Sequence, residues 1–286
     1  MKTINPKNKI VIATGGTGGH VFPAVSLAEH LTNNYDVMVT TDQRGLVYLN
    51  KLLKKFKIKT INSSTIFKKN PLKIFYSLFL ILFSTCKSFV FLKNFKPKIV
   101  IGMGGYSSFP VCVSALILKI PVIIYENNLL IGKANKYLLP LVDKIFLSTP
   151  ETKGIKPKYE NKIFISGNFI RQEIENYRHN IDYRDKKLKI VIMGGSQAAK
   201  IFGEVLPQIF VECKKVGIHL SIVQQCLDTQ KEYLTNFYNT QKIDNEVFTF
   251  RSDITQIFKN TSFVITRGGA SAQAELINCN IPYIVV

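Results

Sequence analysis

Short apolar runs that end near a pair of glycines recur along this 286-residue chain. Four runs follow the pattern: Lys9–Ile12 before Gly15 and Gly16, Lys98–Ile101 before Gly104 and Gly105, Lys189–Ile192 before Gly194 and Gly195, and Phe263–Thr266 before Gly268 and Gly269. A short, continuous, β-branched run predicts a strand buried on both faces, as in a parallel sheet with crossover helices. Ligands bind where such strands end, so the glycines mark candidate sites.

The first and third runs lie 180 residues apart, which predicts two similar α/β domains. Helix-like stretches follow the first, third and fourth runs, whereas Pro110 predicts a break before the apolar segment 111–118. Residues 151–188 are mostly polar and charged, so we expect the domain boundary between Arg171 and Lys187. The predicted domains are residues 1–171 and residues 172–286.

The segment 74–86 is an uncharged run of 13 residues between Lys73 and Lys87. A helix that spans a membrane needs about 20 apolar residues, so this run is too short to span. Two interpretations stay open: a buried core helix, or a basic amphipathic helix that lies on a membrane surface. If the helix lies on a membrane surface, we expect the side chains of Lys68, Lys69, Lys73 and Phe75 to face lipid.

Charge changes this picture more than overall composition does. Hydrophobic residues make up 46% of the chain, which excludes collagen-like and mainly disordered proteins. The net charge is +19, and no acidic residue lies between Asp42 and Glu126, a stretch that holds Arg44 and 13 lysines. Such a stretch implies a polyanionic partner: nucleic acid, an anionic membrane or a phosphate-rich substrate.

The five cysteines are scattered, and none forms a C-x-x-C pair. This argues against a disulfide framework and a zinc site, and it favours a reducing, cytosolic compartment. The amino terminus has too short an apolar run for a signal peptide, and it has no small-residue cleavage site.

The first glycine loop reads GGTGGH and precedes a helix-like stretch. It fails the dinucleotide fingerprint because Val21 stands where the third glycine belongs, and no G-K-[ST] follows as in a P-loop. A phosphate loop of another kind is the better interpretation, with a purely structural turn as the alternative. His20 would lie at the helix start, where the helix dipole lowers its pKa and keeps it neutral as a base or hydrogen-bond partner.

Three further loops carry polar groups. GMGGYSSFP offers backbone donors with the hydroxyls of Ser107 and Ser108, and GGSQAA opens a helix that suits a second diphosphate. The segment after Arg267 leads to Gln273 and Glu275, and a carboxylate there can accept two hydrogen bonds from a ribose diol. The polar segment 125–128 follows the predicted strand 121–124 and so emerges on the loop side of the sheet.

Six motifs occur in one order over nearly the whole chain, from about residue 9 to the end: GGTGGH, GMGGYSSFP, YENN, GNFIR, GGSQAA and RGGASAQAE. In this the chain resembles the family of peptidoglycan N-acetylglucosaminyltransferases that convert lipid I to lipid II. The resemblance implies the GT-B fold, in which two Rossmann-like domains with parallel sheets face each other across a cleft. It also implies inverting transfer of N-acetylglucosamine from UDP-N-acetylglucosamine to the C4 hydroxyl of undecaprenyl-diphospho-N-acetylmuramoyl-pentapeptide, with no metal and no other cofactor.

The resemblance assigns roles to residues of this chain. The implied donor-binding residues are Thr17, Gly18, Gly19, Asn128, Arg171, Ser196, Arg251, Ala270, Ser271, Ala272, Gln273, Ala274 and Glu275, with Glu275 on the ribose. The implied acceptor-binding residues are Gly15, Gly16, Gly104, Gly105 and Tyr106. His20 is the first candidate for the base that takes the acceptor proton, and Glu126 is the second. Tyr125 and Asn127 depart from the H-E-Q-N motif of the family.

The implied acceptor lies in the inner leaflet, so we expect a peripheral protein on the cytoplasmic face of the inner membrane, anchored by its lysine-rich stretch to anionic lipid. Nucleic acid is not expected as a partner, because the lysines lack aromatic stacking motifs and a groove-reading helix.

The family continues past the end of this sequence with a glutamine-bearing loop, so we expect an incomplete second domain and a weak affinity for UDP-N-acetylglucosamine. The alternatives are an inactive fragment of that enzyme or another GT-B glycolipid transferase. A nicotinamide-dependent oxidoreductase, with Asp42 on a ribose, is disfavoured by the broken fingerprint.

Overall fold

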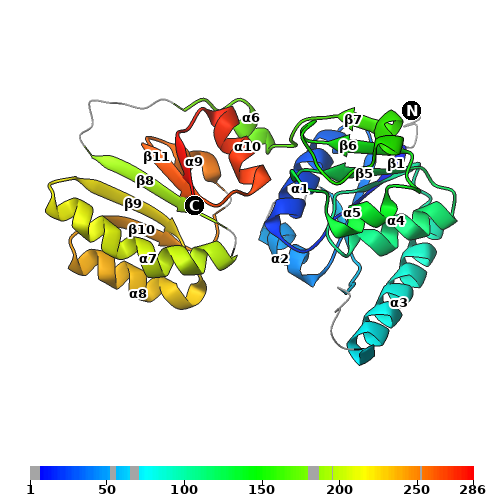
Figure 1. Cartoon of the computed structure of the whole chain (residues 1–286), viewed down its shortest axis with the longest axis horizontal. Helices are drawn as coiled ribbons and strands as arrows, with labels where there is room; N and C mark the ends of the chain where they lie inside the picture. Colours follow the sequence, from blue (N-terminus) through cyan, green and yellow to red (C-terminus); the bar gives the residue numbers. More distant parts are fainter. Residues whose placement is uncertain (1–6, 52–55, 65–70, 180–186, 195, 252) are drawn as a thin grey trace, which may run out of the picture. The chain divides into compact units, whose positions relative to one another are not determined.

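The computed structural model describes residues 7–51, 56–64, 71–179, 187–194, 196–251 and 253–286. The chain forms two compact units, Met1–Arg171 and Gln172–Val286. Each unit is a parallel sheet with helices packed against it (Figure 1).

The first unit contains a seven-stranded sheet of order β3-β2-β1-β4-β5-β6-β7, in which every pairing is parallel. Its strands are β1 (Lys9–Ala13), β2 (Asp36–Thr41), β3 (Lys57–Thr60), β4 (Ile99–Gly102), β5 (Val122–Glu126), β6 (Lys144–Leu147) and β7 (Ile163–Ile165). Its helices are α1 (Gly18–Thr32), α2 (Gln43–Lys51), α3 (Pro71–Phe95), α4 (Ser108–Ile117), α5 (Lys133–Leu138) and the 3₁₀ helix η1 (Pro157–Lys162).

Alternate residues of the central strands face two separate cores, as the continuous apolar runs predict. Ile10 and Ile12 of β1 pack with α1 and α2 on one face of the sheet. Val11 and Ala13 pack with α4 and α5 on the other face. The predicted strand is therefore buried on both sides.

The second unit contains a five-stranded parallel sheet of order β10-β9-β8-β11-β12. Its strands are β8 (Leu188–Met193), β9 (Leu220–Gln225), β10 (Asp244–Phe248), β11 (Phe263–Thr266) and β12 (Tyr283–Val285). Its helices are α6 (Gln172–Glu175), α7 (Ser196–Lys215), α8 (Asp228–Thr240), α9 (Ile254–Phe258) and α10 (Ala270–Cys279). Residues of α7 and α8 share a core with Ile190 and Ile192, and residues of α6, α9 and α10 share one with Val191 and Val264.

The break predicted at Pro110 is wrong. Helix α4 begins at Ser108, so Pro110 lies in its first turn. Proline is tolerated there because the amides of the first turn have no intrahelical acceptor to lose.

The helix that contains segment 74–86 is longer than the uncharged run suggests. Lys87 and Lys93 do not end helix α3, because lysine is a good helix former, and the helix continues to Phe95. The stretch Ile74–Phe95 is long and apolar enough to cross a membrane by length and composition alone.

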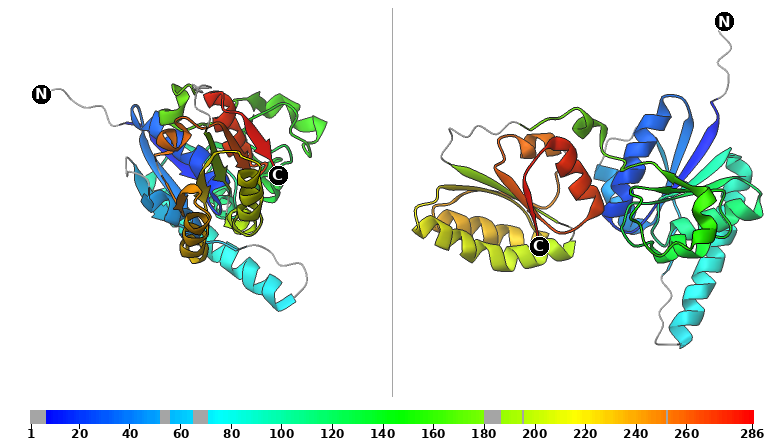
Figure 2. Two further views of the ribbon diagram at one scale, coloured as in Figure 1. Left: turned by 90° about the vertical axis from the view of Figure 1, so that its left-hand side faces the viewer. Right: turned by 45° about the horizontal axis from the view of Figure 1, so that its top comes forward.

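Helix α3 is not a buried core helix, because only 17% of its most apolar stretch is buried. It projects beyond the rest of its unit in all three ribbon views (Figures 1 and 2). Lys68 and Lys69, which we expected to face lipid, lie outside the described residues, as does the side chain of Lys73.

Candidate functional site

Three polar loops meet at the carboxyl edge of the first sheet. Strands β1, β4 and β5 are neighbours, with Ala13 opposite Gly102 and Gly102 opposite Ile124 in the register. Because all three strands are parallel, the loops that follow them emerge side by side. The first unit therefore brings together the expected acceptor-binding residues, both candidate bases and four of the expected donor-binding residues.

The first two glycine loops touch each other, which explains their glycines. A Cβ atom on Gly105 would lie 2.3 Å from the carbonyl oxygen of Gly15, and one on Gly15 would lie 1.6 Å from the Ser107 hydroxyl oxygen. Gly16, Gly104 and Gly105 also have φ values between +81° and +87°, where glycine is favoured. Close packing of the two loops thus requires small residues even without a ligand.

The amide of Gly16 has a protein partner. It donates to Oδ1 of Asp42 over 3.1 Å, and the same oxygen accepts the amide of Gly45 over 2.8 Å. Asp42 follows β2, and its other carboxylate oxygen pairs with Arg44 at 2.7 Å. Asp42 therefore shapes the first loop, a role that sequence reasoning missed; the signal was an acidic residue directly after a buried strand.

His20 is partly buried at the start of α1, against the second glycine loop. A Cβ atom on Gly104 would lie 2.8 Å from its Nδ1 atom, so the glycine leaves room for the ring. Burial lowers the pKa of His20, and this outweighs the charge of Glu126 and a hydrogen bond with the Met103 backbone, which raise it. Nδ1 has no hydrogen-bond partner among the described residues. The ring is therefore neutral near pH 7, with Nδ1 buried and unbonded within the described part of the chain.

Glu126 is only 1% exposed, and four groups donate to its carboxylate. Oε1 accepts the backbone and side-chain amides of Asn128, over 3.1 and 2.8 Å. Oε2 accepts the Gly132 amide and the Asn135 side chain, over 2.8 and 3.0 Å. These bonds position Asn128 and leave Glu126 less suited than His20 to accept a proton.

The expected donor-binding residues Thr17, Gly18 and Gly19 lie at the amino terminus of α1. The Thr17 carbonyl accepts the amides of His20 and Val21, which starts the helix. A Cβ atom on Gly18 would lie 2.7 Å from the Phe22 ring. The Gly19 carbonyl accepts the side-chain amide of Asn127 over 2.8 Å, so the segment after β5 is tied to this helix end.

Tyr125 and Arg171 are buried within the first unit. Tyr125 donates to the Gly167 carbonyl over 3.3 Å, and burial raises the pKa of its hydroxyl to about 12. The guanidinium of Arg171 lies 5.3 Å from the centre of the Phe22 ring, within the range of a cation–π contact. Both side chains hold the segment 167–171 against the sheet.

The second unit carries its own polar edge. Strands β9, β8 and β11 are neighbours, so Gln225 at the end of β9, Gly194 after β8 and Arg267 after β11 lie at one carboxyl edge. The Gly194 amide donates to Oε1 of Gln225 over 3.1 Å. Gln225 is a residue that sequence reasoning missed, because an isolated glutamine gives no signal. The side chain of Ser196 lies outside the described residues.

The remaining expected donor-binding residues lie near the same edge. Ala270, Ser271, Ala272, Gln273, Ala274 and Glu275 form the first half of α10, and Glu275 is buried. Arg251, after β10, forms ion pairs with Glu246 and Asp253, and these acidic partners raise its pKa. The fixed guanidinium favours a role of the Arg251 backbone over one of its side chain.

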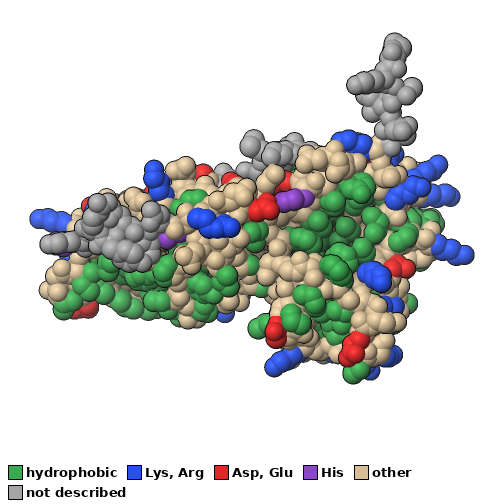
Figure 3. Space-filling view, turned by 90° about the horizontal axis from the view of Figure 1, so that it is seen from above, with side chains coloured by type: hydrophobic (Ala, Val, Ile, Leu, Met, Phe, Trp, Pro, Cys, Tyr) green, Lys and Arg blue, Asp and Glu red, His purple; other side chains and the backbone are tan. Residues whose placement is uncertain are grey.

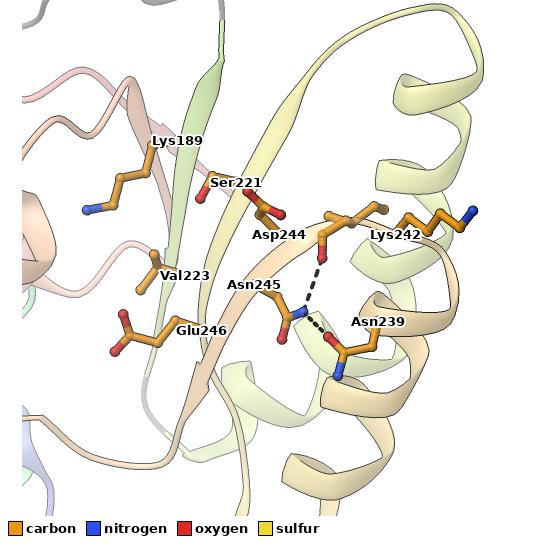
Figure 4. A pocket seen from close by; sticks show the side chains of 9 residues that line it. Lys189, Ser221, Val223, Asn239, Lys242, Asp244, Asn245 and Glu246 are labelled. Atoms are coloured by element: carbon orange, nitrogen blue, oxygen red, sulfur yellow. Dashed lines mark hydrogen bonds between the residues drawn. The ribbon is translucent and has the colours of Figure 1, made fainter.

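A cavity of about 660 Å³ lies away from these loops, near the amino ends of β8, β9 and β10. Figure 4 shows Lys189, Ser221 and Glu246 on one side of these strands, with Asn245 bonded to Asn239 at 2.9 Å on the helix side. Parallel sheets bind ligands at their carboxyl edge, so this cavity is separate from the candidate site. Within the described residues no cluster of three His, Cys, Asp or Glu side chains could hold a metal.

Comparison with known families matches both units. The model of the glycosyltransferase family 28 N-terminal domain matches residues 10–147, and that of the glycosyltransferase family 28 C-terminal domain matches residues 189–286.

Two curated relatives carry the name UDP-N-acetylglucosamine–N-acetylmuramyl-(pentapeptide) pyrophosphoryl-undecaprenol N-acetylglucosamine transferase. The protein of Pelagibacter ubique is 36% identical over 97% of this chain and 77% of its own length. The protein of Rickettsia felis is 32% identical over 97% of this chain and 78% of its own length.

Among solved structures, the crystal structure of Acinetobacter baumannii MurG is similar, with a TM-score of 0.69 and 26% identity over 98% of this chain and 77% of that chain. The Staphylococcus aureus MnaA–UDP structure has a TM-score of 0.63 at 16% identity, which indicates a shared fold alone. The expected pair of Rossmann-like domains with parallel sheets is confirmed. The chain belongs to glycosyltransferase family 28, in the family of these N-acetylglucosamine transferases.

Proposed function

We propose that the protein transfers N-acetylglucosamine from UDP-N-acetylglucosamine to the C4 hydroxyl of undecaprenyl-diphospho-N-acetylmuramoyl-pentapeptide, giving the disaccharide lipid of peptidoglycan synthesis. The observation that carries the proposal is similarity at 32–36% identity over 97% of the chain to transferases named for this reaction. The polar carboxyl edges of both sheets support it, because each offers backbone amides near a helix start, where diphosphates bind.

In the proposed reaction, the acceptor C4 oxygen forms a bond to C1 of the donor sugar. The bond from C1 to the diphosphate oxygen breaks, and its electron pair leaves with UDP. His20 takes the proton from the acceptor hydroxyl, since its neutral ring lies beside both glycine loops. The acceptor oxygen attacks C1 from the side opposite the leaving diphosphate, which inverts the anomeric configuration. Backbone amides and helix ends stabilise the leaving diphosphate, so no metal is proposed.

Glu126 has a positioning role in this proposal. Its carboxylate holds both amides of Asn128 and, through Asn135, the start of α5. Asn127 links the same segment to Gly19 of α1. Asn128 and Gly19, both expected to contact the donor, are therefore connected by one network of hydrogen bonds.

The membrane surface is the proposed second partner, bound by helix α3. The side of α3 that is buried carries Ser77, Ser84 and Ser88, and the hydroxyl of Ser114 in α4 donates to the Thr85 carbonyl over 2.7 Å. The exposed side carries large apolar residues: Phe75, Tyr76, Leu78, Phe79, Leu82 and Phe83. A helix that buries small polar residues and exposes aromatic ones suits a lipid environment.

Charge supports the same partner. The acid-free stretch between Asp42 and Glu126 includes α3. Lys and Arg side chains also project on the upper face of the first unit, which Figure 3 shows and which is not the side of the α3 tip. Lysines near anionic lipid contribute about 1 kcal/mol each. We propose peripheral binding at the cytoplasmic face of the inner membrane, where the acceptor lies.

The test is transfer of radiolabelled N-acetylglucosamine from the UDP-sugar to the muramoyl-pentapeptide lipid, with and without a chelator. We expect label on that lipid in both conditions and none on diacylglycerol or ceramide. Label on another glycolipid acceptor, or no transfer at all by the folded protein, would contradict the proposal.

A further inference from the structure

An exposed arginine adjoins the first glycine loop, at a position outside the set of expected ligand-binding residues. Arg44 lies in the first turn of α2, and its side chain is 60% exposed. A Cβ atom on Gly16 would lie 3.6 Å from its Nη2 atom. Because β2, β1 and β4 are neighbours, the loops that carry Arg44, Gly16 and Gly104 all follow the same sheet edge.

A buried carboxylate fixes this guanidinium. Oδ2 of Asp42 accepts Nε and Nη2 of Arg44 over 3.1 and 2.7 Å. Burial raises the pKa of Asp42, but hydrogen bonds from Gly45, Arg44 and Gly16 together lower it below its ordinary value. The carboxylate is therefore charged near neutral pH, and the arginine stays oriented along the loop.

Helix stability does not explain a positive charge at this place. The amino end of a helix is the positive end of its dipole, so a cation in the first turn is unfavourable. Asp42 already caps α2 through the Gly45 amide and needs no arginine to do so. Among the described residues Nη1 of Arg44 has no hydrogen-bond partner, so its N–H groups remain open to a ligand.

The first glycine loop also has one backbone amide fewer that could donate to an anion. The Gly16 amide donates to Asp42, so it cannot serve an anion. A donor from outside the loop can take the place of this amide on a diphosphate at this edge. A guanidinium matches phosphate oxygens with parallel N–H groups, and a charged donor is about twice as strong as a neutral amide.

We propose that Arg44 binds the diphosphate of the polyprenyl-linked acceptor through the N–H groups that Asp42 leaves open. This inference rests on the proposed function, which supplies that acceptor. Asp42 has two effects here. It accepts the hydrogen bond of the Gly16 amide, which is then not available to an anion, and it orients the guanidinium of Arg44 so that a cation lies beside the first glycine loop.

The experiment compares Arg44→Gln, Arg44→Lys and the matched control Lys57→Gln in the full chain, with a short-chain acceptor. Lys57 is an equally exposed cation of the same unit, paired with Asp36 at the amino end of its strand. We expect Arg44→Gln to raise the acceptor KM about 10-fold or more, the size of one lost charged hydrogen bond. The donor KM and kcat should change little, and Arg44→Lys should be intermediate; the melting temperature reports separately the loss of the ion pair with Asp42. Inorganic pyrophosphate should compete with the acceptor less well against Arg44→Gln than against the unmodified protein.

The outcomes separate this inference from the proposed function. No transfer by the unmodified protein refutes the proposed function. Normal transfer, with the acceptor KM unchanged in Arg44→Gln or raised equally in Lys57→Gln, refutes the role of Arg44 alone. A rise in the donor KM instead assigns Arg44 to the donor diphosphate and also overturns the inference. Vesicle binding lost with Arg44→Gln would place the arginine on lipid headgroups.

Discussion

Two ionisable side chains near the carboxyl edge of the first sheet, Glu126 and His20, differ in their hydrogen bonds. Glu126 receives four hydrogen bonds, so its charge is fixed in place. Nδ1 of His20 has no partner among the described residues, and burial lowers the pKa of the ring. A neutral imidazole is suited to take a proton, whereas a carboxylate that accepts four hydrogen bonds is suited to hold its neighbours.

At the residue scale we expect His20 to set the acid limb of the pH–rate profile. Because burial lowers its pKa below 6.5, kcat should stay level from pH 8 to about 6.5 and fall only at lower pH. His20→Asn should lower kcat by about 100-fold or more and leave the donor KM little changed. The matched variant His30→Asn, on the same helix, should keep the full profile; equal losses in both variants would contradict the role of His20.

The same pKa shift predicts how stability depends on pH. The folded pKa of His20 lies below its unfolded value, so the unfolded chain binds the extra proton first as pH falls. This contribution to stability is complete above about pH 6.5 and is lost as pH falls through the folded pKa. Denaturant unfolding between pH 5 and 8 should therefore show a flatter dependence for His20→Asn than for the unmodified protein.

At the element scale, the two glycine loops are held by their own packing. Gly104 and Gly105 have positive φ values, and Gly105 lies against the backbone of Gly15. Backbone atoms cannot move aside as a flexible side chain can. The loops therefore form a rigid edge before any ligand binds, which is what preorganised binding requires.

We expect Gly105→Ala to destabilise the first unit far more than Gly167→Ala does. Both positions have positive φ, which costs about 1–2 kcal/mol for alanine, but a Cβ atom meets nothing within 4 Å at Gly167. The clash with Gly15 should bring the loss at Gly105 to about 3 kcal/mol or more. Denaturant unfolding measures both losses, and equal values would show that the loops can separate at little cost.

At the scale of the whole molecule, basic charge and exposed apolar surface coincide on α3. The helix lies in the stretch that has no acidic residue, and Phe75 and Leu82 are 74% and 63% exposed. Water exposure of such side chains is costly, and lipid would remove that cost. Charge would draw the unit to an anionic surface, and the apolar side chains would then hold it there.

Leu82→Glu should reduce binding to anionic vesicles about 10-fold or more, because a charge replaces an apolar side chain in the proposed lipid contact. Val205→Glu makes the same kind of change on α7, where the side chain is 52% exposed, and should bind as before. Sedimentation with vesicles at low and high salt measures both effects. Binding that survives Leu82→Glu, or fails equally in Val205→Glu, would contradict the role of α3.

Local patterns in the sequence predict much of the fold. The four apolar runs became β1, β4, β8 and β11, all interior strands of a parallel sheet, where alternate residues of a short β-branched run are buried on both faces. The loops after them lie at the carboxyl edges, as parallel strands require. The sequence alone therefore predicts that the candidate site lies at these carboxyl edges.

What the sequence alone determined is the position of the strands and of the loops between them, since these depend on residues close together in the chain. The tertiary structure decided which polar groups remain open: Asp42 binds Gly16 across 26 positions, and Asn127 binds Gly19 across 108. It also decided that α3 buries Ser84 and Ser88 and exposes aromatic side chains such as Phe75 and Phe79, because only the packing against α4 defines an inner side. Hydrogen bonds and packing connect residues that are close in space but far apart in the chain, and a local sequence pattern does not show which residues these are.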